Sequence, residues 1–159
     1  MSRAETNQLT MQSKSILILA NRQCAGLVFP LLDDLQSAAL VSPIAGSGNH
    51  AHRLLGHLVF SEGRYREMME RIVNPSQSLQ DKFGGGSQPD PKAAGYPSYQ
   101  ELLIRLRSMD EEFMARLEGT SEEELDRVVE GVPPQFELCF GTWRHMFLMR
   151  AMHWMNHRG

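Results

Sequence analysis

Residues 74–97 read NPSQSLQDKFGGGSQPDPKAAGYP, and this segment decides the fold. Its four prolines and the run Gly84-Gly85-Gly86 predict a loop rather than a helix or a strand. The glycine run has no following Lys-Ser or Lys-Thr, so we expect it to supply flexibility rather than a phosphate-binding loop. A loop of this length inside a compact domain needs a structural reason.

Helical patterns lie on both sides of this loop. Apolar residues recur at three- and four-residue steps from His50 to Val73, with Asn49 as the expected N-cap. A second stripe runs from Ser98, the expected cap, to Glu118, and Gly119 is expected to end it. Two further helices are predicted, one from about Thr10 to Gln36, where Pro30 should kink or divide it, and one from Thr142 to the end of the chain.

Four amphipathic segments predict an all-α four-helix bundle in a single domain of residues 1–159. The segment 74–97 is long enough to return along the whole bundle, about 30 Å, so the helices on its two sides should run parallel. The short turn at residues 42–49 makes the first two helices antiparallel. The expected order is therefore up, down, down, up. Ser121 should begin a further short helical turn, and residues 128–140 should form either a small hairpin or an irregular crossing.

Composition limits the classes of partner. A net charge of -3 offers no basic surface for nucleic acid or an anionic membrane, so small molecules or proteins are the expected partners. The N-terminus lacks the pattern of a signal peptide and the run Ile16–Ala20 is too short to span a bilayer, so we expect a cytoplasmic protein. Cys24 and Cys139 belong to neither a CxxC pair nor a disulfide framework, and both are expected to be buried thiols.

His153 and His157 are the strongest candidates for chemistry. Residues four apart on a helix share one face, so both imidazoles can approach one metal ion. A structural metal site usually has four protein ligands, whereas a catalytic site can use three and keep an open position. The chain must therefore supply at least one more ligand.

The predicted bundle indicates where that ligand lies. The first half of the His50–Val73 helix lies at the same end as the end of the last helix, which makes His57 the third candidate. His50 and His52 are alternatives, although their place at the helix start favours solvent exposure or capping. His145, two turns before His153, is expected to be a structural histidine that makes hydrogen bonds.

These residues resemble a known family. The segment Leu54-Leu55-Gly56-His57-Leu58-Val59-Phe60-Ser61-Glu62 and the distant His153-x-x-x-His157-Arg158-Gly159 resemble the DinB superfamily, which includes YfiT-like proteins described as metal-dependent hydrolases. The resemblance covers nearly the whole chain. It implies that His57, His153 and His157 hold a divalent transition metal, commonly zinc or nickel, which brings a thiol cofactor such as mycothiol or bacillithiol to an electrophile.

Two departures from the family pattern are visible. Chains of the family usually continue beyond the His-Arg-Gly motif, whereas this chain stops at Gly159. Position 154 is Trp, so the two terminal histidines do not form the His-Glu-x-x-His of zinc peptidases and no general base follows from the motif.

Two functions of different classes remain open at this point. The first is a small metalloenzyme, either a thiol-dependent S-transferase acting on small electrophiles or a metal-dependent hydrolase. The second is a non-catalytic helical bundle, such as a stress-response protein or a homodimer whose metal only supports the fold. Three imidazoles suit zinc, nickel, copper or iron, so the residues alone do not identify the metal.

Overall fold

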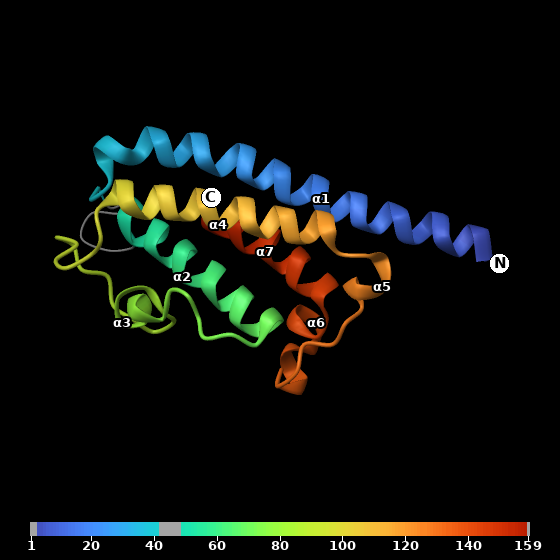
Figure 1. Cartoon of the computed structure of the whole chain (residues 1–159). Helices are drawn as coiled ribbons and strands as arrows, with labels where there is room; N and C mark the ends of the chain where they lie inside the picture. Colours follow the sequence, from blue (N-terminus) through green and yellow to red (C-terminus); the bar gives the residue numbers. More distant parts are fainter. Residues whose placement is uncertain (1–2, 42–48, 159) are drawn as a thin grey trace. The chain divides into compact units, whose positions relative to one another are not determined.

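The computed structural model describes residues 3–41 and 49–158, with side chains described from residue 13 onward. Within these ranges the chain is helical and contains no β-strand, so the predicted all-α class is confirmed (Figure 1). The four long helices match the four predicted segments. The helices are α1 (Arg3–Asp34), α2 (Ala51–Glu70), α3 (Gln80–Phe83), α4 (Tyr99–Gly119), α5 (Glu122–Leu125), α6 (Glu137–Phe140) and α7 (Trp143–Arg158).

The chain divides into two compact units. One unit is Leu27–Glu111, which holds α2, α3, the last part of α1 and the first part of α4. The other combines Met1–Gly26 with Glu112–Gly159 and holds α5, α6, α7 and the remaining parts of α1 and α4. The expected turn at residues 42–49 lies outside the described residues, apart from Asn49.

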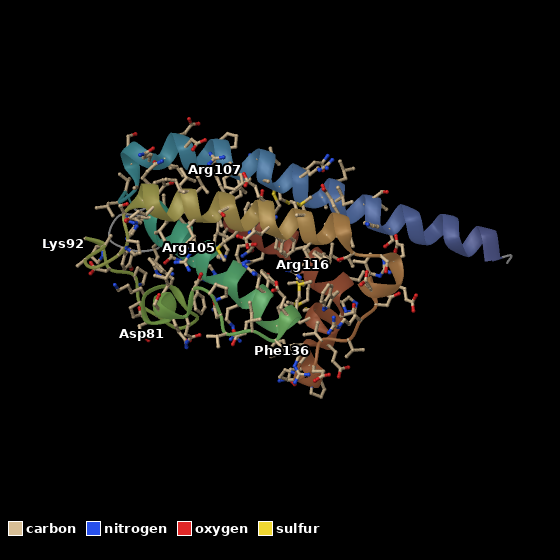
Figure 2. All side chains as sticks on the ribbon, viewed as in Figure 1. Asp81, Lys92, Arg105, Arg107, Arg116 and Phe136 are labelled. Atoms are coloured by element: carbon tan, nitrogen blue, oxygen red, sulfur yellow. The ribbon has the colours of Figure 1, made fainter. Side chains whose placement is uncertain are left out.

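In the unit Leu27–Glu111, α4 packs on the end of α1. The Tyr99 hydroxyl donates to the Leu32 carbonyl at 2.7 Å, and Arg107 binds the Asp33 carboxylate at 2.8 and 2.9 Å. Figure 2 shows Arg107 on the side of α4 nearer α1 and Arg105 on the side nearer α2. These contacts leave one face of α4 for α1 and another for α2 and the segment that follows it.

The start of α2 differs from its prediction. His50, not Asn49, is the N-cap, because His50 Nδ1 accepts a hydrogen bond from the Arg53 backbone N–H at 3.1 Å. His52 Nε2 donates to the Pro97 carbonyl at 2.8 Å, and its ring lies 5.7 Å from the ring of Tyr99. The two helices α2 and α4 therefore begin at the same end of this unit.

The sequence also predicted the start of α4 and an effect of Pro30 on α1. Ser98 caps α4 as expected, since the Glu101 N–H donates to Ser98 Oγ at 3.2 Å. Glu101 completes the cap, because its Oε2 accepts from the Ser98 N–H at 2.8 Å. Pro30 lies inside α1, which continues to Asp34, so of the two expected effects, a kink or a division, the division does not occur.

The segment 74–97 is more structured than its composition predicted. It contains a 3₁₀ turn at Gln77–Leu79 and the short helix α3, which lies beside α2 (Figure 1). Leu79 and Phe83 are buried, and four-residue spacing places them on one face of this helical turn. Burial of these two side chains outweighs the loop-forming composition around them.

The glycine run that follows α3 shapes a tight turn. Gly86 has a φ of +81°, in the left-handed region that favours glycine, and a Cβ on Gly84 would lie 2.6 Å from the Gln80 carbonyl oxygen. Gly84 and Gly86 therefore shape this turn, a role that the sequence did not predict.

The second unit is held together by α7 and α1. Met146, Phe147 and Trp154 of α7 are fully buried, and Asn21 of α1 donates to the Phe147 carbonyl at 3.0 Å. Ser121 and Glu124 form the expected capping box at the start of α5. In the described chain Val128 pairs only with Thr142 as an isolated bridge, and α6 follows, so residues 128–140 form an irregular crossing rather than a hairpin.

One described stretch, Ser13–Ala38, is long and apolar enough by composition to cross a membrane. Core helices of soluble proteins pass the same test, and this stretch contributes Leu17, Cys24, Val28 and Leu32 to the buried core. A single apolar helix near the N-terminus is weak evidence for a membrane span.

Candidate metal centre

The histidine pair on α7 has the predicted arrangement. His153 and His157 are one turn apart, their rings are 4.6 Å apart between centroids, and His157 Nε2 lies 2.9 Å from His153 Nε2. Between them, Trp154 is fully buried and the Arg150 guanidinium lies 3.8 Å from its ring centroid. Trp154 is therefore on the buried side of α7, and the two histidines on either side of it in the sequence are partly exposed.

The separation of the two Nε2 atoms suits a shared ion. Two imidazole nitrogens bound to one metal at about 2.1 Å lie about 3.0 Å apart at a right angle and about 3.4 Å apart at a tetrahedral angle. The observed 2.9 Å is close to the first value. The same separation also allows a hydrogen bond in which one ring carries the proton and the other accepts it.

His57 of α2 is a half-buried histidine with a defined partner. Its Nδ1 lies 2.8 Å from the Phe83 carbonyl oxygen, so Nδ1–H donates and the lone pair is on Nε2. Burial lowers the pKa of His57, the Phe83 carbonyl opposes this, and the nearby Arg53 charge lowers the pKa further. The result favours the neutral imidazole, which is the form that binds metals.

The alternative histidines have other roles. His50 is 1% exposed, and its two ring nitrogens bond to the Arg53 N–H and, at 2.8 Å, to the Asp90 carbonyl. Of the two expected alternatives, capping or solvent exposure, His50 has the capping role. His145 Nδ1 is buried and has no hydrogen-bond partner among the described residues. The hydrogen bond that we expected for this ring is therefore not made at Nδ1.

Together, His57, His153 and His157 make up a three-histidine cluster that could hold a metal ion. Among the described residues, no other group of three or more His, Cys, Asp or Glu side chains has ligand atoms this close together. All three are partly buried, and all three are imidazoles. An all-imidazole donor set suits zinc, copper, iron or nickel better than magnesium or calcium.

The two cysteines differ from each other. Cys24 is buried, donates to the Ala151 carbonyl at 3.4 Å, and has a pKa raised by burial and only partly offset by the charge of Arg150. Cys139 is partly exposed, so the expectation of a second buried thiol was wrong. Its position on the short helix α6, in an irregular part of the chain, explains the exposure.

The sequence did not reveal the role of Phe83. Its ring is fully buried, and its backbone carbonyl bonds to His57. The spacing of Leu79 and Phe83 could have indicated a short buried helix. A backbone carbonyl leaves no mark on residue type, so its bond to His57 had no sequence signal.

Two comparisons with known proteins bear on this site. The family model of the DinB superfamily matches residues 20–159, a range that contains the whole of α2, α4 and α7 and all three clustered histidines. No curated protein matches the chain.

Proposed function

Because the chain belongs to the DinB superfamily, we propose that His57, His153 and His157 bind one divalent transition metal, zinc or nickel. We propose further that the protein is a thiol-dependent S-transferase that acts on small electrophiles, with a low-molecular-weight thiol as its second cofactor. The observation that carries the proposal is the 2.9 Å separation of the Nε2 atoms of His153 and His157.

The donor set fits such an ion. Three imidazoles supply three ligands, and a three-ligand site keeps a position open for water or substrate. A divalent ion in that site would supply Lewis acidity, lowering the pKa of a thiol or a water molecule that binds at the open position.

The residues around the ligands have separate tasks in this proposal. Phe83 holds His57 in the metal-binding tautomer, and the burial of His57 disfavours its protonation. Leu54 and Leu58 flank His57 on α2, and Met149 precedes His153 by one turn on α7. We assign to these apolar side chains the exclusion of competing water from the thiol.

The proposed function also implies a fold, an oligomeric state and a cellular location. We propose a single four-helix domain of residues 1–159 with the order up, down, down, up. Support comes from α2 and α4, which begin at the same end of their unit, as parallel helices do. We also propose a cytoplasmic homodimer with a small-molecule substrate and without a nucleic-acid or membrane partner, a choice supported by the net charge of -3.

A titration of the cobalt-substituted protein with thiols tests the function. We expect a new sulfur-to-cobalt charge-transfer absorption in the wild-type protein and none in His153→Ala. If no thiol changes the spectrum and no electrophile shows metal-dependent turnover, the transferase is refuted. Metal-dependent ester or amide hydrolysis would then favour the hydrolase, and its absence the non-catalytic bundle.

A further inference from the structure

The Phe83 carbonyl oxygen receives two donors from α2. His57 Nδ1–H donates at 2.8 Å, and Arg53 Nη1 donates at 3.4 Å. Arg53 and His57 are four residues apart, so their side chains lie on one face of α2. The carbonyl that orients the proposed metal ligand is therefore itself bound by a second side chain of the same helix.

This carbonyl is available because a helix ends there. Phe83 is the last residue of α3, and the final carbonyls of a helix have no partner within it. The next residues turn back tightly through Gly84 and Gly86, and Ser87 Oγ lies 2.7 Å from the Gly84 carbonyl. Within this turn, the Phe83 carbonyl, the Ser87 carbonyl and Ser87 Oγ contact Arg53 of α2.

Arg53 binds both ends of this turn. Its Nη2 donates to Ser87 Oγ at 2.6 Å and to the Ser87 carbonyl at 3.2 Å, while Nη1 reaches Phe83. Arg53 is only 6% exposed, and its hydrogen-bond partners in the described chain are these oxygens rather than a carboxylate. A buried guanidinium is costly unless its donors are satisfied, and the turn satisfies Nη1 and Nη2, whereas Nε has no partner among the described residues. The turn therefore supplies all the hydrogen bonds that this guanidinium makes in the described chain.

We propose that Arg53 is a positioning residue for His57. It holds the Phe83–Ser87 turn in place, so that the Phe83 carbonyl fixes the His57 imidazole with its proton on Nδ1 and its lone pair on Nε2. The effect on the metal rests on the proposed function, whereas the effect on the tautomer does not. Outer hydrogen-bond partners of this kind typically change metal affinity about ten- to hundredfold.

The test compares Arg53→Met with Arg105→Met. Arg105 is a matched control because it binds the same segment at its other end, donating to the Pro75 carbonyl at 2.6 Å and to Ser76 Oγ at 3.0 Å. It touches neither Phe83 nor Ser87 in these bonds. Both variants lose an arginine that holds the segment 74–97, but only one loses the contact with the turn.

The first readout is the tautomer of His57 in the metal-free protein. Long-range ¹H–¹⁵N correlation spectra of histidine-labelled protein distinguish the two tautomers, and the His57→Gln spectrum assigns the signal. We expect the Nδ1–H form in the wild type and in Arg105→Met, and a shift toward the Nε2–H form in Arg53→Met. An unchanged tautomer in Arg53→Met would overturn the proposal.

The second readout is metal affinity, measured by competition with a chelator. We expect about ten- to hundredfold weaker binding in Arg53→Met and near wild-type binding in Arg105→Met. Equal losses in both variants would overturn the proposal, because they would indicate a general effect of loosening the segment. A changed tautomer in a protein that binds no metal would refute the proposed function and leave the positioning role supported.

If Arg53→Met does not fold, Ser87→Ala carries the test. Ser87 is partly exposed, so this change leaves the core intact. It removes the 2.6 Å bond from Arg53 to Ser87 Oγ together with the bonds from Ser87 Oγ to the Lys82 and Gly84 carbonyls. We expect the His57 tautomer to shift toward the Nε2–H form, although less than in Arg53→Met. Metal binding should be weaker than in the wild type. Wild-type values for both readouts would overturn the proposal.

Discussion

Replacing Gly56 by Ala tests the link between packing and the metal ligand. A Cβ at this position would lie 2.3, 2.4 and 2.5 Å from three atoms of the Phe83 ring, whereas ordinary contacts begin at 3.4 Å. The ring must therefore move by about 1 Å (3.4 minus 2.3 Å). Because Phe83 is fully buried, the shift should carry its backbone and stretch the 2.8 Å bond to His57.

Two opposing effects set the stability of this variant. Overpacking of a buried site typically costs about 1–3 kcal/mol, and Ala favours a helix interior over Gly by about 1 kcal/mol. The free energy of unfolding should therefore fall by roughly 0–2 kcal/mol. Metal affinity should fall more clearly, about ten- to hundredfold, since His57 loses its orienting partner.

Gly26→Ala is the matched control. Gly26 lies inside α1, and a Cβ there would have no atom within 4 Å, so this variant should be about 1 kcal/mol more stable than the wild type. Urea denaturation measures the free energy of unfolding of each variant, and chelator competition measures its metal affinity. The reasoning is refuted if Gly56→Ala gains the same stability as Gly26→Ala and binds metal as tightly as the wild type.

Two further predictions follow from buried groups. Burial, with a smaller effect of Asp33, raises the pKa of Tyr99 to about 12, so its contribution to stability is complete below about pH 10 and is lost as pH rises through about 12. Denaturation at pH 9 and 12 should show a loss of up to roughly 3 kcal/mol from Tyr99 that is absent in Tyr99→Phe, and equal losses in both proteins would contradict this. A thiol reagent should label Cys139 quickly and Cys24 only after unfolding; rapid labelling of native Cys139→Ala would show that Cys24 is accessible.

Parts of the fold that depend on local chemistry could be predicted from the sequence. The long helices follow from the spacing of apolar residues, and the caps at Ser98 and Ser121 follow from a serine three residues before a glutamate. Both signals are contained within a few residues. Neither depends on how distant parts of the chain meet.

The errors concern residues whose state is set by distant contacts. His50 replaces Asn49 as the cap of α2 while its other nitrogen bonds to the Asp90 carbonyl, 40 residues away in sequence. The helix α3 exists because Phe83 packs against Gly56 of α2. Composition described this segment as a loop. The spacing of Leu79 and Phe83 fits a helical turn, but it does not show that the turn packs on α2.

In the candidate site too, local features could be predicted from the sequence and contacts between distant residues could not. Four-residue spacing predicted the shared face of His153 and His157, which lie 2.9 Å apart between their Nε2 atoms. The prediction of His57 as the third ligand required the expected order of the helices as well as the spacing of apolar residues. The bonds that orient His57 come from the Phe83 backbone and, through the turn to Ser87, from Arg53, and residue type alone does not predict such contacts.

The metal content of purified His153→Ala, compared with His145→Ala and the wild type, tests the central claim most directly. His145 is a suitable control because it is a histidine of the same helix that lies outside the three-histidine cluster. Elemental analysis should find a divalent transition metal in near-stoichiometric amount in the wild type and in His145→Ala, and a sharp loss in His153→Ala. Wild-type metal content in His153→Ala, or an equal loss in both variants, would contradict the assignment of the site.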